Sequence, residues 1–168
     1  INTYTTADQT QPSISSLTNG GFVVSWTSSE QDGDGLGIFG QRYDASGMKD
    51  GGEFQINASI AGSQSTASVS GLNNGGFVIS WTSNQQIYAQ RYDVSGVADD
   101  GEFQVATYAA SLKISPATSS LKNGGFIVIW SSHLQDGNSW GIFGQRYDAS
   151  GATDGGEFQI KTHVTDEQ

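Results

Sequence analysis

Residues 37–56 read GIFGQRYDASGMKDGGEFQI and residues 141–160 read GIFGQRYDASGATDGGEFQI, so only two of these 20 positions differ. A more divergent copy surrounds Arg91, which stands in the same Gln-Arg-Tyr frame. All three arginines of the chain occupy this frame. The chain is therefore three copies of one unit, and the arginine marks either a shared structural contact or a shared ligand contact.

The three copies differ in the length of one loop. Phe22, Phe77 and Phe126 each follow Gly-Gly, and they are 55 and 49 residues apart. The difference lies between tryptophan and arginine, which are 16 residues apart in the outer copies and 10 apart in the middle one. The opening INTY also matches the IKTH that starts at Ile160, which indicates a piece cut from a longer array. We predict one repeat domain over residues 1–168, with repeats at about 10–63, 64–113 and 114–168.

The composition restricts the classes of partner. The net charge is −10 and the pI is about 4.2. Nucleic acid and anionic membranes favour basic surfaces, whereas an acidic surface suits cations such as calcium. Cysteine is absent, so the chain has no disulfide and no thiolate site. No segment of the sequence reads as a signal peptide, a membrane-spanning helix or a lipid anchor.

Each copy is predicted to form four β-strands. Asn-Gly and Gly-Gly before each central strand favour tight hairpins, because they accept positive φ angles. The FVVSW run that starts at Phe22 barely alternates, which indicates a strand buried on both faces. No helical period is sustained anywhere, so the fold class is all-β. In the first copy we predict strands at residues 13–17, 22–26, 38–43 and 53–56.

Four antiparallel strands per unit of about 50 residues are typical of a β-propeller blade. We therefore expect three four-stranded antiparallel repeats that form propeller-like blades. A β-trefoil or a three-sheet prism is the alternative, since both also use three such units. Closed propellers have about four to eight blades. A homodimer that completes a six-bladed ring, or neighbouring repeats of a longer chain, would supply the missing blades.

The combination GGFVVSW, GQRYDASG and GGEFQIN resembles a repeat found in tandem in very large secreted bacterial proteins of the RTX and adhesin type. The resemblance covers essentially the whole chain. It implies an extracellular or cell-surface location and surroundings rich in calcium. The nonapeptide calcium motif of RTX proteins is absent here, so the resemblance does not carry calcium binding with it.

The long loop of the outer copies is a candidate calcium site. It reads QDGDG in the first copy and QDGNS in the third. Asp and Asn alternating with Gly can turn several oxygen atoms toward one hard cation. A solvated β-turn with the same composition is the alternative interpretation. The candidate metal ligands are Asp32, Asp34, Asp136 and Asn138.

Each arginine has a glutamate 11 residues further on, beyond the Asp-Ala-Ser-Gly or Asp-Val-Ser-Gly turn. A hairpin would bring the two side chains together across strands three and four. They would form either a cross-strand ion pair or, beside a tryptophan, a site for sugar hydroxyls and a sugar ring. The spacing is similar to that of six-bladed fucose-binding lectins, which implies lectin-like glycan sites between blades. The pairs are Arg42 with Glu53, Arg91 with Glu102, and Arg146 with Glu157.

The tryptophans are the remaining candidates for ligand contact. Trp26, Trp81 and Trp130 recur in register, and aromatic residues in register form blade cores more often than ligand platforms. Trp140 stands outside the repeat consensus, because the first copy has Leu36 at that position. All four are kept as candidate ligand-binding residues.

Catalysis has little support in the sequence, and we predict no catalytic residue. The two histidines occupy non-equivalent positions, and no nucleophile elbow, zinc-protease motif or phosphate loop occurs. We expect a non-enzymatic module for adhesion or carbohydrate binding through equivalent sites, with calcium as a possible ligand. A structural spacer or assembly repeat of a large surface protein, without a small ligand, is the alternative.

Overall fold

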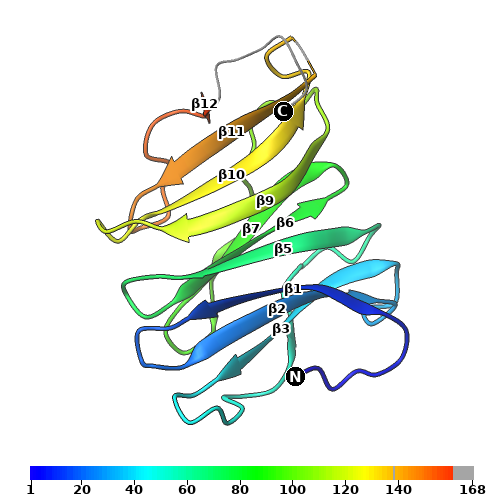
Figure 1. Cartoon of the computed structure of the whole chain (residues 1–168), viewed down its shortest axis with the longest axis vertical. Helices are drawn as coiled ribbons and strands as arrows, with labels where there is room; N and C mark the ends of the chain where they lie inside the picture. The colour runs from blue at the N-terminus through cyan, green and yellow to red at the C-terminus, as the bar shows by residue number, and fades with distance from the viewer. Residues whose placement is uncertain (138, 161–168) are drawn as a thin grey trace.

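The computed structural model describes residues 1–137 and 139–160. In this part of the chain, twelve strands form three antiparallel sheets of four (Figure 1). Each sheet contains consecutive strands in chain order. The first contains β1 (Gln9–Ser16), β2 (Phe22–Ser29), β3 (Leu36–Tyr43) and β4 (Phe54–Gln55). The second contains β5 (Gln64–Gly71), β6 (Phe77–Ser83), β7 (Gln86–Tyr92) and β8 (Ala98–Gln104). The third contains β9 (Lys113–Ser120), β10 (Phe126–His133), β11 (Trp140–Tyr147) and β12 (Phe158–Gln159).

The predicted all-β class and the three four-stranded repeats are confirmed. Three separate sheets of consecutive strands do not match the trefoil alternative. Strand β1 begins four residues earlier than the predicted 13–17, because a register shift between Thr10 and Ser13 lets the polar residues before it pair with β2. The described residues contain no helix long and apolar enough to cross a membrane.

Two turns shape each sheet. The Gly-rich turn between β1 and β2 places Gly20 at φ 85°, a conformation that favours glycine. The turn at residues 44–47 is closed by Asp44, whose carboxylate accepts hydrogen bonds from Ser46 and from the backbone N–H of Met48. The Ser46 hydroxyl and these backbone groups hold the pKa of Asp44 below its ordinary value. Copies of this second turn lie at residues 93–96 and 148–151.

The sheets stack face to face, and β1, β5 and β9 lie side by side (Figure 1). Serine hydroxyls link these first strands. Ser13 Oγ accepts from the backbone N–H of Val69 at 3.2 Å, and Ser15 Oγ accepts from Gly71 at 2.9 Å. The same two bonds recur from the second sheet to the third. We call each contact between neighbouring sheets a joint, and the described part of the chain contains two.

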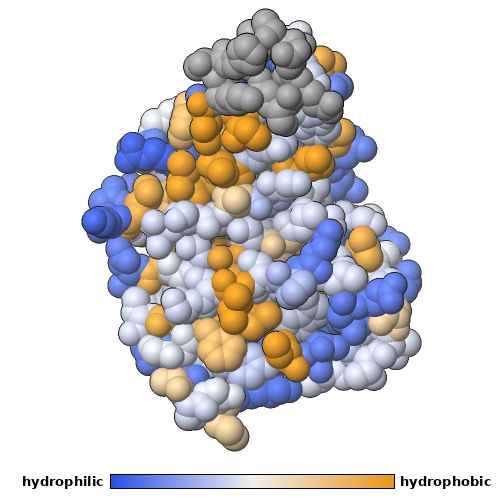
Figure 2. Space-filling model, in the orientation of Figure 1, coloured by the Kyte–Doolittle hydropathy of each residue, from blue (hydrophilic) through white to orange (hydrophobic). Residues whose placement is uncertain are grey.

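Each joint has its own hydrophobic core. One cluster joins Val23 and Ile38 of the first sheet to Ile79 and Trp81 of the second. The corresponding cluster joins the second sheet to the third, and a smaller one lies on the outer face of the first sheet. Strand β2 is buried on both faces, as predicted, whereas burial alternates along β10, where one face lacks a neighbouring sheet among the described residues. Hydrophobic side chains are visible at the surface over the first and third sheets (Figure 2).

Candidate functional site

Two of the three arginines, Arg42 and Arg91, bridge neighbouring sheets. Arg42, on β3, pairs with Asp50 of its own sheet at 2.6 Å. Its guanidinium also donates to the backbone carbonyls of Ser95 and, at 3.1 Å, Val94 in the turn of the next sheet. Arg91 repeats the arrangement, with Asp99 at 2.7 Å and the Ser150 carbonyl in the turn at residues 148–151.

Arg146 differs from the other two arginines in its exposure. It pairs with Asp154 at 2.8 Å, as its counterparts do with their aspartates. Its side chain is 47 % exposed, whereas those of Arg42 and Arg91 are 9 % exposed. No following sheet exists among the described residues to receive its guanidinium. Among the described residues, Arg146 therefore makes the within-sheet ion pair of its counterparts without their inter-sheet hydrogen bonds.

The predicted Arg–Glu pairs do not form, and this prediction is wrong for all three copies. The register pairs Gly40 with Phe54, so Glu53 lies opposite Gln41. Side chains of successive strand residues point to opposite faces, which places Arg42 and Glu53 on different sides of the sheet. The aspartates in the hairpin take the arginines instead. The pairs affected are Arg42–Glu53, Arg91–Glu102 and Arg146–Glu157.

The glutamates instead fasten the connector that precedes each sheet. Glu53 Oε2 accepts hydrogen bonds from the backbone N–H of Thr3 at 2.5 Å and from its hydroxyl at 2.9 Å. Glu157 does the same with Thr107, at 3.0 Å for both bonds. Glu102 accepts from the backbone N–H of Ala58 at 2.8 Å. All three carboxylates therefore hold equivalent points of the repeat.

Two glutamates have an additional partner that the sequence did not reveal. Gln31 donates to Glu53 Oε1 at 2.5 Å, and Gln135 donates to Glu157 Oε1. In both glutamines the side-chain Oε1 is buried and has no hydrogen-bond partner among the described residues. Burial alone raises the pKa of Glu53, but the hydrogen bonds from Thr3 and Gln31 outweigh it and lower that pKa. We call these two groups the Gln–Glu–Thr clusters: Gln31, Glu53 and Thr3; and Gln135, Glu157 and Thr107.

The Gln–Glu–Thr clusters occur only where the long loop is present. Gln31 and Gln135 are the first residues of the QDGDG and QDGNS segments. The second copy lacks six residues there, and β6 and β7 are joined by Asn84 and Gln85 alone. Glu102 therefore keeps its connector contact without a glutamine beside it. The loop-length difference was the signal in the sequence that could have located these clusters.

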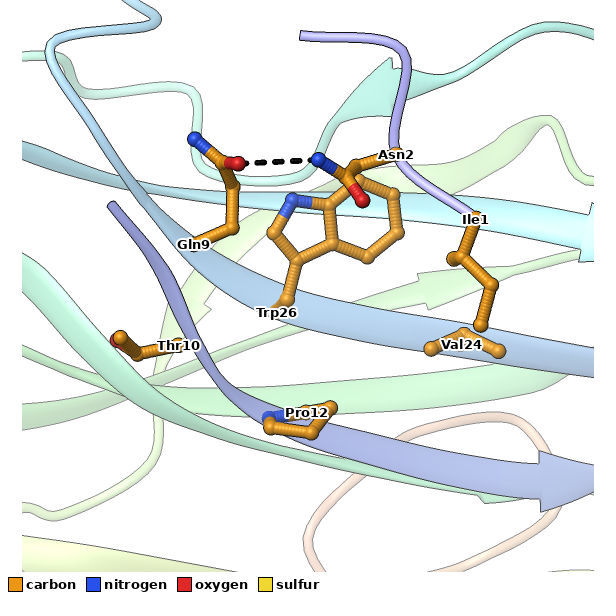
Figure 3. Close-up of a pocket in the computed structure, with 7 residues that line it drawn as sticks. All are labelled: Ile1, Asn2, Gln9, Thr10, Pro12, Val24 and Trp26. Atoms are coloured by element: carbon orange, nitrogen blue, oxygen red, sulfur yellow. Dashed lines mark hydrogen bonds between the residues drawn. The ribbon is translucent and has the colours of Figure 1, made fainter. Parts of the chain in front are cut away.

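Two of the three repeated tryptophans, Trp81 and Trp130, belong to the joints. Trp81 is 0 % exposed and Trp130 is 1 % exposed, so neither ring offers a surface to a ligand, and the prediction of a ligand contact is wrong for both. Trp26 is also buried, but it lines a cavity of about 160 Å³ on the outer face of the first sheet (Figure 3). Trp140 lies half-buried beside His133, with the ring centres 5.1 Å apart, and its ligand role stays a prediction.

The Trp26 cavity corresponds to a filled space elsewhere in the chain. Ile1, Val24 and Trp26 line it, and Asn2 donates to Gln9 across its rim (Figure 3). The equivalent residues of the second sheet pack against Val23 and Ile38 of the first sheet in the joint cluster. The indole nitrogens of all three repeated tryptophans lack a partner in the described structure, so this feature does not distinguish Trp26. The cavity thus lies on the face that, in the second sheet, packs against the preceding sheet.

The acidic loops do not gather their carboxylates at one point. Asp32 Oδ2 accepts from the amides of Gln55 and Asn57 at 3.4 and 3.3 Å, while Asp34 Oδ2 accepts from the backbone of Gly62 at 3.1 Å. Asp136 accepts from Gln159 at 2.7 Å, and Asn138 lies outside the described residues. Across residues 1–137 and 139–160, no three acidic or histidine side chains converge as metal ligands. Calcium binding by these loops stays a prediction.

Comparisons with known proteins bear on the fold. No protein-family model matches the sequence, and no curated protein matches it either. Among solved structures, an endo-arabinase from Bacteroides thetaiotaomicron is 16 % identical with a TM-score of 0.55, and the match covers 90 % of this chain and 61 % of that one. The Hadza microbial sialidase Hz136 is 13 % identical with a TM-score of 0.63, and the match covers 86 % of this chain and 36 % of that one.

A third similar structure is closer in size. The fucose lectin from Kordia zhangzhouensis, in complex with methyl-fucoside, is 12 % identical with a TM-score of 0.51. The match covers 92 % of this chain and 99 % of the lectin, whereas the chain spans less than two thirds of the arabinase and of the sialidase. Identities this low carry information on the fold alone. The three sheets are blades of the β-propeller type.

Proposed function

We propose that this chain is a non-enzymatic carbohydrate-binding propeller module that binds glycans at its two Gln–Glu–Thr clusters. The observation that carries the proposal is the buried, unpartnered Oε1 of Gln31 and of Gln135, each beside a carboxylate. Sugar hydroxyls both donate and accept hydrogen bonds. A carboxylate with an adjacent amide oxygen offers acceptors at a spacing that neighbouring hydroxyls can use.

The position of the clusters supports repeated, weak binding. Both lie where a connector meets the outer strand of a blade, and Thr3 is exposed there. Two equivalent sites on one chain increase avidity for a surface that carries many copies of a glycan. Fold neighbours whose names include a sugar or a glycosidase fit the same ligand class. An extracellular location and a role in adhesion belong to this proposal.

The second blade provides an internal control. Glu102 occupies the position of Glu53 and Glu157 and holds its connector in the same way, but it lacks the glutamine. We therefore expect glycan affinity to depend on Gln31 and Gln135 and not on Glu102. A residue that only fastens the connector would have similar effects in all three blades.

A glycan array, run in calcium and repeated in EDTA, tests the proposal. We expect one sugar class to bind, and the double variant Gln31→Ala/Gln135→Ala to lose at least tenfold in affinity under conditions in which circular dichroism shows that it is fully folded. Glu102→Gln is the matched control and should retain binding. A blank array in both buffers, or unchanged affinity of the double variant, would reject the proposal.

A structural assembly module is the second candidate function. It is favoured by the use of Arg42 and Arg91 as contacts between blades, which explains their repetition without any ligand. An acidic, cysteine-free surface keeps such an array soluble. A blank glycan array would leave this function as the interpretation of the repeats.

A further inference from the structure

We propose that two copies of this chain associate head to tail and close a ring of six blades. The joint seen twice within the chain is heterologous: one blade offers an arginine and an outer-strand phenylalanine, and the next offers a turn and an aromatic face. Among the described residues, the arginine and phenylalanine of the third blade have no neighbouring blade to contact. The turn and aromatic face of the first blade likewise have none. This inference is independent of carbohydrate binding.

The half-joint on the third blade is more exposed than its counterparts. Phe54 and Phe103 pack against Tyr92 and Tyr147 of the next blade, with the ring centres 5.5 Å apart in both cases. Phe158 is the third copy and is 38 % exposed. Arg146 of the same blade is also exposed, and Ile127 and Ile142 are only half-buried. Their counterparts Val78, Ile87, Val23 and Ile38 are 0 % exposed.

The half-joint on the first blade is the complement. Ile14 is 66 % exposed, whereas its counterpart Val69 is 6 % exposed. The backbone N–H of Val69 is held by a serine of the preceding blade, and the described residues contain no blade that would hold Ile14 in the same way. The cavity beside Trp26 lies on this face, where the equivalent space of the second blade is filled by two aliphatic side chains. A second copy would fill it with Ile127 and Ile142.

The surroundings of the glycine in the hairpin turn differ between blades that receive an arginine from a neighbouring blade and the blade that does not. A Cβ atom added to Gly96 would lie 2.2 Å from Arg42 Nη1, and one added to Gly151 would lie within contact distance of Arg91 Nη1. A Cβ atom added to Gly47, the copy on the first blade, meets no atom within 4 Å. The space beside Gly47 is therefore the arginine site of a joint, and Arg146 of the second copy fits it.

A second copy is the occupant because one chain supplies both halves. Two heterologous joints related by a twofold axis close a ring when the rotation between blades permits it. Six blades lie within the range of closed propellers. The ends of the chain must rearrange when the ring closes. Ile1 lies beside Trp26, as Ile56 lies beside Trp81 in the next blade. In the ring, Ile160 of the second copy would compete with Ile1 for that position.

The mass of the full chain in solution, measured by light scattering or native mass spectrometry, is the first test. One chain has a mass of 17.7 kDa, so the ring has about twice that value, near 35 kDa. A monomer at micromolar concentration would overturn the proposal. A concentration-dependent ladder of larger species would also overturn it, because such species require a joint that does not close.

Two variants test the location of the interface. We expect Gly47→Ala to raise the dimer dissociation constant at least tenfold, because its methyl group occupies the arginine site. Arg146→Ala should do the same from the other half of the joint. Gly51→Ala is the matched control: Gly51 also has positive φ and open space around it, and Asp100 occupies its position in the second blade. A dimer that survives Gly47→Ala and Arg146→Ala, or one lost equally in Gly51→Ala, would place the interface elsewhere.

Discussion

The guanidinium of Arg91 donates a hydrogen bond to the backbone carbonyl of Ser150, which lies 59 residues further along the chain. The same arginine pairs with Asp99 within its own blade. It therefore couples an outer hairpin to the turn of the following blade, and it is largely buried in doing so. The repetition of the joint explains why Arg42 and Arg91 occupy the same position of their copies.

Arg91→Ala is expected to destabilise the fold. The substitution leaves the Ser150 carbonyl and Asp99 without the cation, and hydrogen bonds to charged groups contribute about 1.5–3 kcal/mol each. We expect the free energy of unfolding, measured in urea, to fall by roughly that amount. Arg91→Lys keeps the charge but not the two-pronged geometry, so its loss should be smaller. Equal stability of wild type and Arg91→Ala would contradict the structural role.

The sequence predicted the number of repeats, the four antiparallel strands in each and the repetition of the arginine contact. These follow from hydrophobic runs, glycine turns and the spacing of copies, which are local signals. The partners of Arg42 and Glu53 were not predictable from their spacing of 11 residues. They depend on the register of β4, which places the two side chains on opposite faces.

Other features depended on contacts between copies. Gln31 was visible only as part of a candidate calcium loop, and its contact with Glu53 depends on how that loop folds back. The glutamate contact with Thr3 spans 50 residues and joins a blade to the preceding connector. The burial of Trp81 was expected from its periodicity, whereas the cavity at Trp26 depends on which blade lies at the end of the stack. Such features can be located only when the packing of the blades against one another is known.

Lys113 is buried and donates to the carbonyls of Tyr108 and Ser111 and to the side chain of Gln86. Burial lowers its pKa below the ordinary value. The equivalent residues Gln9 and Gln64 donate to local carbonyls in the other blades. Lys113→Gln should therefore be nearly neutral. Lys113→Met should lower the free energy of unfolding by about 1–3 kcal/mol, because it leaves buried carbonyls unsatisfied.

Thermal and urea unfolding of both Lys113 variants would check this expectation. The two substitutions have similar side-chain lengths, so packing alone predicts little difference between them. A Gln variant as unstable as the Met variant would indicate that the positive charge itself is required. A stable Met variant would show that water satisfies the carbonyls of Tyr108 and Ser111.

The lowered pKa of Glu53 predicts how this carboxylate changes the free energy of unfolding as the pH falls. Because this pKa is lower in the folded chain than its ordinary value, the ionised carboxylate stabilises the fold. That contribution is complete above the unfolded pKa of about 4.3. It is lost as the pH falls through the lower folded pKa. Between pH 6 and pH 3, wild type should therefore lose more stability than Glu53→Gln.

Urea titrations at a series of pH values would measure this difference. Gln31→Ala provides an intermediate case, because it removes one of the hydrogen bonds that keep the pKa of Glu53 low. Its pH dependence should lie between those of wild type and Glu53→Gln. If the unfolding free energies of wild type and Glu53→Gln depended identically on pH, the Glu53 carboxylate would have the same pKa in the folded and unfolded chains.

Calcium binding to the loop at residues 31–35 is expected to be weak. Asp32 already accepts hydrogen bonds from the amides of Gln55 and Asn57, and Asp34 holds the backbone of Gly62. A cation would have to displace these donors before it gained two carboxylates, and calcium prefers six to eight oxygen ligands. We expect a dissociation constant of about a millimolar, in the range of weak extracellular sites.

Isothermal titration calorimetry with wild type and Asp32→Asn measures that affinity directly. The variant keeps an oxygen that can accept hydrogen bonds but removes one charge, so calcium heat should fall while the unfolding midpoint stays unchanged. Micromolar binding would mean that the loop rearranges into a genuine coordination site with further backbone oxygens. Heat that is absent even at several millimolar calcium would reduce the acidic loop to a turn, because the hydrogen bonds of Asp32 and Asp34 would then account for both carboxylates.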